Sequence, residues 1–235
     1  HNYNSLVASW CYNIARGRDI HIEDAEEELV LVYVTDVVQA IMAALLGELL
    51  PGDDGYCHVP DAYSIQAGRL ADLLYAFRDS RETLIMPSLH YRLDSYLYAT
   101  YLSYLPEDAF AYHLDMRQDE RGWLAEFIKS EEQGQIFISL TKPGITRGNQ
   151  WHQTKVEKFL VLRGKAVIAF RRTDSMDVIE YTVSGERLTV VDVPVGYTHS
   201  IQNIGEDDLI TLFWAGEMFD PENPDTEYLD VYLDA

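Results

Sequence analysis

The sequence predicts an α+β protein with two parts, a mainly helical α/β part over residues 1–116 and an antiparallel β-barrel or jelly roll over residues 117–235. In the first part apolar residues recur at intervals of three or four, which is typical of amphipathic helices. From about Gln118 onward, short alternating segments follow one another between glycine turns, which is typical of antiparallel strands. With 47% hydrophobic residues in 235 positions, the chain can bury a core in each part.

The first part is expected to open with a helix and a strand. Asn4 or Ser5 can cap a helix that ends at Gly17. The apolar run 29–34 is rich in β-branched residues, so it predicts a buried strand rather than a helix.

Three more helices are expected before the strands begin. Thr35 and Asp36 can cap a helix over residues 37–46, and a strand, a cap and a helix in succession are typical of α/β folds. Ser64 is expected to begin a second amphipathic helix, and a third covers about 89–105. We interpret the tyrosines of this last helix as packing and interface residues rather than catalytic ones: Tyr91, Tyr96, Tyr98, Tyr101 and Tyr104.

The second part is expected to form at least six strands. Their regular spacing between glycine turns indicates an antiparallel sandwich or barrel. The predicted strands cover residues 136–140, 158–162, 166–170, 178–183, 188–193 and 209–214.

Charge and composition limit the partners of this chain. Acidic residues outnumber basic ones by 39 to 18, which gives a net charge of −21 and repels nucleic acids and anionic membranes, so neither is expected as a partner. Cys11 and Cys57 are too few for a disulfide framework. No segment approaches the roughly 18 apolar residues of a membrane span and no signal peptide is evident, so we expect a cytoplasmic protein. Because the chain starts at His1 rather than Met, we expect it to be part of a longer protein.

Motifs for a nicotinamide cofactor are missing from the α/β part. The sequence contains neither G-x-G-x-x-G nor Tyr-x-x-x-Lys, and residues 1–128 contain no lysine. This part by itself is therefore not expected to bind such a cofactor.

Two motifs in the second part carry the strongest chemical signal. The first spans residues 144–164 and the second spans 194–203, and both combine histidine with glycine turns. An amide, two imidazoles and a carboxylate that converge inside a small barrel can bind zinc, iron or manganese. The four candidate ligands are Gln150, His152, Glu157 and His199.

The spacing of these residues constrains how the chain must run. Gln150 and His152 are two residues apart on an extended chain, so they point to one face. Glu157 lies five residues beyond His152, an odd offset, so the chain is expected to turn at 153–155 and return as a neighbouring strand. A bend before His199 brings a distant strand to the same cavity. Because a glutamine oxygen binds zinc less well than imidazole does, a three-ligand site and a metal-free site both remain open.

These motifs resemble the two signature motifs of the cupin superfamily, which implies a small β-barrel around the site. Two departures are visible. Gln150 stands where the first histidine of the superfamily motif is usual, and Gly185 precedes Pro194 by nine residues, which is longer than the usual spacing.

Longer segments resemble the CapF type of bifunctional capsular polysaccharide enzymes, which join a short-chain reductase to a cupin. The resemblance implies that residues 1–116 are the substrate-side part of a reductase domain and that residues 117–235 form a complete cupin. The resembling segments are residues 2–5, 31–38, 98–106, 122–129, 141–159, 196–203 and 217–226.

The same resemblance implies a reaction and its cofactors. The substrate is expected to be a UDP-linked 4-keto-6-deoxy-N-acetylhexosamine, whose C3 the cupin epimerises and whose C4 ketone the reductase then reduces with NADPH. It places the NADPH motif upstream of His1, so the reductase half is expected to be incomplete here. A divalent metal, with zinc expected, is implied for the cupin.

The chemistry of such an epimerisation leaves two schemes open. A metal held by His152, Glu157 and His199 can stabilise the enolate that forms when the carbon beside the ketone loses a proton. Alternatively the metal is structural, and a histidine transfers the proton together with Lys155 or Tyr197. Candidate contacts to the diphosphate are basic side chains near the first motif, although each can also be ordinary surface charge: Lys142, Arg147, Lys155 and Lys158.

Two other functions remain open, and so does the assembly. The chain can be a non-catalytic module that binds a sugar nucleotide, or a metal-dependent cupin oxygenase, which Gln150 disfavours. A homodimer is expected, because the tyrosine-rich first part lacks its sheet partners and cupins often pair.

Overall fold

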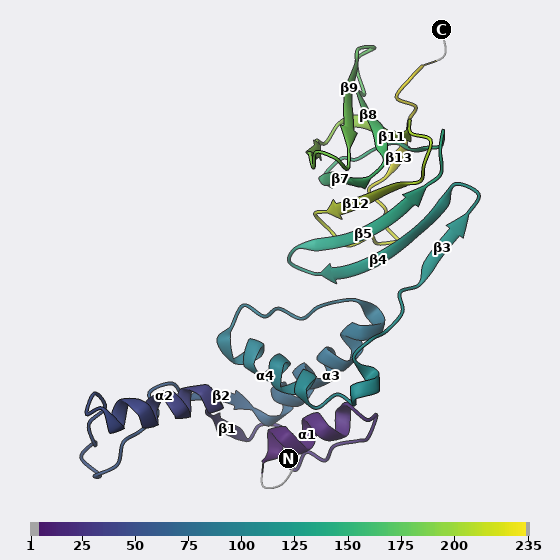
Figure 1. The fold of residues 1–235 in the computed structure, drawn as a ribbon. Helices are drawn as coiled ribbons and strands as arrows, with labels where there is room; N and C mark the ends of the chain where they lie inside the picture. The colour runs from purple at the N-terminus through teal and green to yellow at the C-terminus, as the bar shows by residue number, and fades with distance from the viewer. Residues whose placement is uncertain (1–4, 234–235) are drawn as a thin grey trace. The chain divides into compact units, whose positions relative to one another are not determined.

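A computed structural model describes residues 5–233 of the chain, which divide into two compact units (Figure 1). The first unit comprises the chain up to Thr83 together with Pro87–Ala111, and the second comprises Leu84–Met86 and the chain from Tyr112 onward. Helices dominate the first unit and antiparallel strands the second, so the predicted α+β class is confirmed.

The first unit contains helices and one small antiparallel sheet. Ser5 caps the first helix, and its Oγ accepts a hydrogen bond from the Ala8 N–H at 3.3 Å. The other predicted cap, Asn4, lies outside the described residues. The elements are α1 (Leu6–Ile14), β1 (Glu28–Leu31), α2 (Val34–Leu45), β2 (Tyr63–Gln66), α3 (Ala67–Thr83), α4 (Arg92–Ser103) and a short 3-10 helix (Glu107–Ala109).

Several elements differ from the prediction. The buried strand expected over residues 29–34 is wrong: β1 ends at Leu31, and its side chains alternate between exposed and half-buried. Only Leu29 and Leu31 pack against the core, whereas Val30 is 71% exposed, because β1 belongs to a two-stranded sheet.

The helix expected from Ser64 begins only at Ala67, because residues 63–66 pair as β2 with β1 and the Ala67 N–H donates to the Glu27 carbonyl. Strand pairing therefore takes the backbone groups that a cap at Ser64 would have used. Likewise α2 begins at Val34 rather than at residue 37, which places Asp36 in its first turn.

The core of the first unit lies between α1, α3 and α4. The apolar face of α3 is fully buried in it, as its periodicity predicts: Leu70, Leu73, Leu74 and Phe77. Cys11 lies in the same core, and burial raises the pKa of its thiol to about 12. Tyr101 is also buried there, whereas Tyr91 is exposed, so the tyrosines of α4 divide between core and surface.

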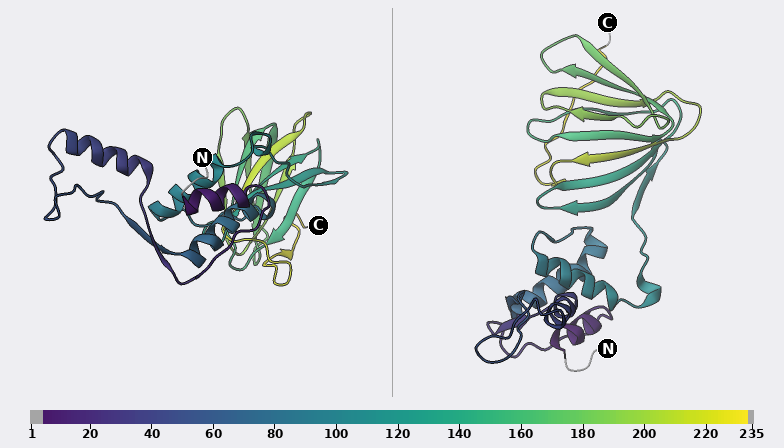
Figure 2. Two further views of the ribbon diagram at one scale, coloured as in Figure 1. Left: turned by 90° about the horizontal axis from the view of Figure 1, so that it is seen from below. Right: turned by 60° about the vertical axis from the view of Figure 1, so that its left-hand side comes forward.

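Helix α2 is attached by its first turn and is otherwise uncovered. Asp36 is buried and accepts hydrogen bonds from Arg92 at 3.0 Å and from the Tyr96 hydroxyl at 3.3 Å. Beyond that tie, one stripe of α2 presents large apolar side chains that are 52% to 76% exposed: Val34, Val38, Ile41, Met42 and Leu45. Figure 2 shows α2 standing apart from the other helices of its unit.

The second unit is built from two antiparallel sheets that enclose one core (Figure 2). The six-stranded sheet has the order β10-β7-β12-β5-β4-β3, and the five-stranded sheet has the order β13-β6-β11-β8-β9. All six predicted strands are present. The strands are β3 (Met116–Asp119), β4 (Gly122–Ser130), β5 (Gly134–Thr141), β6 (Thr146–Trp151), β7 (Glu157–Arg163), β8 (Lys165–Arg172), β9 (Val178–Ser184), β10 (Val190–Val193), β11 (Tyr197–Asn203), β12 (Leu209–Ala215) and β13 (Glu227–Tyr228).

The path between His152 and Glu157 differs from the prediction. Strand β7 is not the neighbour of β6, since β6 pairs with β11 and β13, whereas β7 pairs with β10 and β12 in the other sheet. The chain therefore crosses from one sheet to the facing sheet at residues 152–156. Glu157 then points into the interior from the opposite sheet. Its odd spacing from His152 therefore does not prevent the two side chains from sharing one site.

A β-bulge in β6 sets the register of the site. His199 lies opposite Gln150, but Ser200 lies opposite Gly148, so Asn149 is the extra residue. Gly148 and Asn149 both have positive φ, 98° and 59°. A Cβ at Gly148 would lie 2.7 Å from the His199 carbonyl oxygen, so this close approach of β6 to β11 requires glycine.

Replacing Gly148 with alanine is expected to lower the free energy of unfolding by more than the matched change Gly144→Ala. Gly144 also has positive φ, 75°, but a Cβ there would meet nothing within 4 Å. Gly144→Ala then costs about 1 kcal/mol for the backbone conformation alone. Gly148→Ala is expected to cost at least about 1 kcal/mol more, because β11 must move. Urea denaturation of both variants measures the difference, and equal losses would contradict the role assigned to the bulge.

Candidate metal centre

Two histidines and one glutamate meet inside the β unit. Their side chains are almost completely buried, with exposed fractions of 1% for His152, 6% for Glu157 and 0% for His199. One Glu157 carboxylate oxygen lies 3.5 Å from His152 Nε2 and 3.3 Å from His199 Nε2. One ligand atom from each residue lies within 4.8 Å of the other two, which is the spacing that a single metal ion requires.

Several nitrogen atoms of this cluster lack the partners that burial normally demands. Among the described residues, His152 Nε2 and both ring nitrogens of His199 are buried without a hydrogen-bond partner. Leaving a buried polar atom unsatisfied costs about 1–3 kcal/mol. A divalent cation between the three side chains would satisfy the nitrogens that face Glu157. The residues present therefore fit a metal ion, and two imidazoles with one carboxylate can hold it while leaving a coordination position open.

The protonation of the cluster also suits a cation. Burial by itself raises the pKa of the Glu157 carboxyl, but the two imidazoles beside it outweigh burial and lower that pKa from 4.5 to about 2. The carboxylate is therefore ionised at neutral pH. His152 Nδ1 lies 2.5 Å from the backbone carbonyl oxygen of Asp225, which can only accept a hydrogen bond. Nδ1 therefore carries a proton, and in the neutral form of the ring the lone pair of Nε2 is directed at the cluster.

Gln150 is the fourth residue that the spacing predicted for this site. It lies directly opposite His199 across the β6–β11 pair and is half-buried. Opposite residues of an antiparallel pair point to the same face, with their Cβ atoms about 4.5–5.5 Å apart. The structure therefore places Gln150 beside the cluster, on the inward face that carries His199.

The two motifs of the sequence meet at His152. Its carbonyl oxygen accepts a hydrogen bond from the Gly196 N–H at 3.0 Å, and Gly196 belongs to the bend before His199. Gly196 has a φ of 75°, which suits the tight bend. This backbone bond ties the start of β11 to the end of the first motif.

The two candidate proton carriers lie in different surroundings. Tyr197 is half-buried, packs against the core and lies two residues before His199, on the same face of β11. Lys155 lies in the crossing between His152 and Glu157, and its Nζ donates to Thr226 Oγ1 at 3.0 Å. Both are therefore close to the cluster along the chain, and Tyr197 shares its inward face.

The structure does not bring all the predicted phosphate contacts to the cluster. Lys158 alternates with the inward-facing Glu157, so it lies on the outer face, where it pairs with Asp192. Because successive side chains of a strand point to opposite faces, the position of Lys158 next to Glu157 already predicts this outward orientation. Lys142 is exposed in the turn after β5. Arg147 does point inward, but it donates to Thr141 Oγ1 at 3.0 Å, and burial lowers the pKa of its guanidinium.

Asp225 is a residue of the site that the sequence did not reveal. Asp225 lies in the loop before β13, and its carbonyl oxygen accepts a hydrogen bond from His152 Nδ1. Its carboxylate accepts hydrogen bonds from the N–H groups of Gln153, Thr154 and Lys155. Burial raises the pKa of this carboxyl, but these bonds outweigh it and hold the pKa well below its usual range. No spacing rule relates a loop aspartate to a histidine so far back in the chain.

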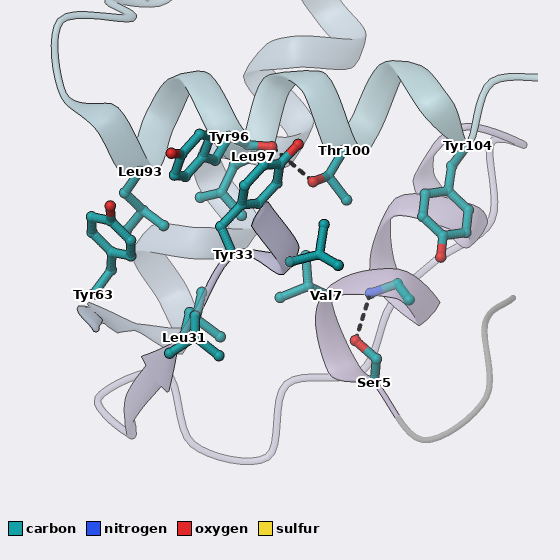
Figure 3. Close-up of a pocket in the computed structure, with 13 residues that line it drawn as sticks. Ser5, Val7, Leu31, Tyr33, Tyr63, Leu93, Tyr96, Leu97, Thr100 and Tyr104 are labelled. Atoms are coloured by element: carbon teal, nitrogen blue, oxygen red, sulfur yellow. Dashed lines mark hydrogen bonds between the residues drawn. The ribbon is translucent and has the colours of Figure 1, made fainter. Parts of the chain in front are cut away.

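The helical unit contains a separate cavity of about 380 Å³ (Figure 3). Tyr33 and Tyr96 stack at one side of it, with ring centroids 3.7 Å apart. Apolar side chains from α1, β1 and α4 complete the wall, and further polar atoms come from Tyr63, Thr100 and Tyr104. Aromatic faces with hydroxyl groups suit a ring-shaped organic ligand. The sequence did not predict this cavity, because its residues come from five separate elements, α1, β1, α2, β2 and α4.

Comparison with known proteins assigns the class. Residues 117–227 match the model of the polysaccharide biosynthesis C-terminal domain. A solved structure of CapF with the inhibitor 3-isopropenyl-tropolone is 48% identical and has a TM-score of 0.93, with 98% of this chain and 67% of that chain covered. The capsular polysaccharide assembling protein CapF from Staphylococcus aureus has a TM-score of 0.92 at 48% identity, with 98% and 62% covered. The β unit with its buried cluster is therefore a cupin-like domain of a polysaccharide biosynthesis protein.

Two curated proteins are also similar. The UDP-2-acetamido-2,6-beta-L-arabino-hexul-4-ose reductase of Pseudomonas aeruginosa is 42% identical over 225 residues, which are 96% of this chain and 60% of that protein. The probable low-salt glycan biosynthesis epimerase Agl13 of Haloferax volcanii is 23% identical over 128 residues, 48% of this chain and 81% of that protein. The chain thus spans about 60% of its reductase relative. It belongs to the CapF-like family of capsular polysaccharide biosynthesis proteins.

No helix within residues 5–233 is long and apolar enough to cross a membrane.

Replacing either histidine of the cluster with alanine is expected to weaken zinc binding by more than about 100-fold. The reason is that a direct ligand contributes more than the 10- to 100-fold that its supporting partners contribute. Gln150→Ala is expected to weaken binding by about 10-fold, as a weaker amide ligand would. Competition with a chromophoric chelator measures the affinities of His152→Ala, His199→Ala and Gln150→Ala.

The matched control is His113→Ala, which removes an exposed histidine of the same unit. Its zinc affinity should equal that of the unchanged protein. An equal loss in His113→Ala, or no loss in His199→Ala, would exclude the cluster as the metal centre.

Proposed function

We propose that the β unit epimerises C3 of a UDP-linked 4-keto-6-deoxy-N-acetylhexosamine for capsular or surface polysaccharide biosynthesis. The observation that carries the proposal is the buried cluster of His152, Glu157 and His199 with its unsatisfied nitrogens. The chain that carries this cluster is also 42% identical to a reductase whose name specifies a UDP-linked acetamido hexulose. We further propose zinc as the metal, with Gln150 as a fourth ligand, and a cytoplasmic location where sugar nucleotides are made.

The proposed reaction needs a proton removed from one face of C3 and returned to the other. Because C3 lies beside the C4 ketone, breaking the C3–H bond moves its electron pair into an enolate. Zinc held by the cluster would supply positive charge that stabilises the enolate oxygen. We assign the two proton transfers to Tyr197, which shares the inward face of β11 with His199, and to Lys155, which must first release Thr226. One of them accepts the C3 proton, and the other returns a proton to the opposite face of C3.

The anionic diphosphate of the substrate needs cations in a chain of net charge −21. Arg147 and Lys155 are the two candidates whose positions support this role, since Arg147 faces inward and Lys155 lies beside His152 along the chain. Lys142 and Lys158 lie on the outside of the unit, so their positions do not support a contact to the diphosphate.

We propose that residues 1–116 are the substrate-side part of a reductase domain whose NADPH-binding part lies outside this chain. Two observations support this proposal. The chain covers only 60% of the reductase relative, and the stripe on α2 leaves large apolar side chains uncovered. Burying that stripe against a further domain would remove exposed apolar surface from water. Reduction of the C4 ketone then requires the longer protein.

The 4-keto sugar nucleotide is expected to take up solvent deuterium at C3 when it is incubated with the zinc-loaded protein in D2O. NMR or mass spectrometry measures the exchange, and NADPH absorbance should stay constant. Tyr197→Phe should slow the exchange by about 100-fold or more, which is the contribution of a positioned proton carrier. Lys158→Ala is the control and should exchange normally.

Failure to exchange would contradict the epimerase proposal if the protein is folded and zinc is bound. Ligand binding without exchange, measured by calorimetry, would instead support the second candidate, a non-catalytic module that binds a sugar nucleotide. Gln150 in place of a histidine favours that candidate.

We also propose a homodimer that forms through the outer face of the six-stranded sheet. Outward positions of β4, β5 and β12 carry half-buried apolar side chains, among them Trp123, Ile138 and Leu212. A second copy related by twofold symmetry can bury this face against itself. Sedimentation equilibrium is expected to give twice the chain mass of 26.9 kDa, and Leu212→Glu is expected to give the single mass. A monomer at micromolar concentration would contradict the proposal.

A further inference from the structure

The crossing between the two sheets carries His152 at one end and Glu157 at the other. Residues 153–155 have no strand partner there, so their backbone N–H groups need acceptors. One carboxylate supplies them all. Asp225 Oδ1 accepts from the Gln153 N–H at 2.8 Å, and Asp225 Oδ2 accepts from the Thr154 and Lys155 N–H groups at 2.7 and 2.8 Å.

The same residue also contacts the first ligand directly. The backbone carbonyl of Asp225 accepts the hydrogen bond from His152 Nδ1, so side chain and main chain of one residue hold both the crossing and the imidazole. Thr154 adds a fourth bond to the carboxylate through its hydroxyl, at 2.9 Å. One residue therefore supplies both the carboxylate that holds the crossing and the carbonyl that accepts the hydrogen bond from His152.

The segment after Asp225 is fixed to the five-stranded sheet. Residues 227–228 pair with β6 as β13. The Thr198 hydroxyl donates to the Leu229 carbonyl, and Arg171 donates to the carbonyls of Asp230 and Val231. The carbonyl of Asp225 is thus presented from an anchored segment rather than from a free loop.

We propose that Asp225 is the positioning residue of the metal centre, which fixes the tautomer of His152 and the span between His152 and Glu157. The inference rests on the metal centre of the proposed function and not on epimerase activity. Partners that orient metal-bound histidines commonly contribute 10- to 100-fold to metal affinity. In this chain a single loop residue has that role for two ligands.

The test compares Asp225→Ala with Asp225→Asn, with Glu222→Ala as the matched control. Glu222 is an exposed acidic residue of the same loop. Asparagine keeps one oxygen and replaces the other with an NH2 group, which cannot accept from the crossing. We therefore expect zinc affinity to fall by about 10- to 100-fold in Asp225→Ala, by less in Asp225→Asn, and not at all in Glu222→Ala.

A second readout does not depend on metal affinity or on activity. Long-range 1H–15N NMR of the metal-free protein reports which nitrogen of each histidine is protonated. We expect His152 to be protonated at Nδ1 in the unchanged protein and in Glu222→Ala, and to show a mixture of tautomers in Asp225→Ala. Cobalt substitution adds a spectroscopic signature, since the visible absorption of bound cobalt should change in Asp225→Ala.

Unchanged zinc affinity and an unchanged His152 tautomer in folded Asp225→Ala would overturn the proposal, as would equal losses in Glu222→Ala. If Asp225→Ala does not fold, Asp225→Asn and Thr154→Val provide the same comparison with smaller changes. Thr154→Val removes only the hydroxyl donor to the carboxylate, so its loss should be the smallest of the series. A protein that lacks C3 exchange but shows these tautomer shifts would contradict the proposed function and leave the role of Asp225 supported.

Discussion

The burial of two imidazoles and a carboxylate inside an apolar barrel is the constraint on which the rest of the β unit depends. Polar atoms that are removed from water need partners, yet His152 Nε2 and both nitrogens of His199 find none among the described residues. The surroundings offer little compensation, since the rings of Phe159 and Phe170 lie beside His199. A cluster that is costly in this state is stabilised when a cation completes it, so metal binding and the stability of the barrel are linked.

The fold meets this constraint by bringing the cluster together from two facing sheets. His199 comes from the five-stranded sheet, where the bulge at Asn149 places Gln150 opposite it. Glu157 comes from the six-stranded sheet, after a crossing that the Asp225 carboxylate holds in place. The bulge and the crossing both position these side chains by fixing the backbone. Positioning His152, Glu157 and His199 through the backbone leaves the side-chain atoms that could bind a metal unoccupied by structural hydrogen bonds.

Much of this could be predicted from the sequence, and the reasons for the failures are physical. The spacing of His152, Glu157 and His199 identified the cluster, and period-2 alternation identified six strands. Alternation along β7 also predicts that Lys158 points away from Glu157, which the structure confirms. The helix expected at Ser64 failed because pairing of β2 with β1 outweighs local capping preference. The role of Asp225 was missed because its contacts cross 70 or more residues.

The sequence by itself determined the two-part α+β organisation, the family and the three residues of the buried cluster, because local periodicity and short motifs encode them. Only the tertiary structure decided that β7 faces β6 from the other sheet, that Arg147 points inward while Lys142 stays outside, and that Asp225 reaches His152. These features depend on which strands pair and on which distant segments pack together. Such contacts form between residues far apart in the chain, so no pattern within a single segment specifies them.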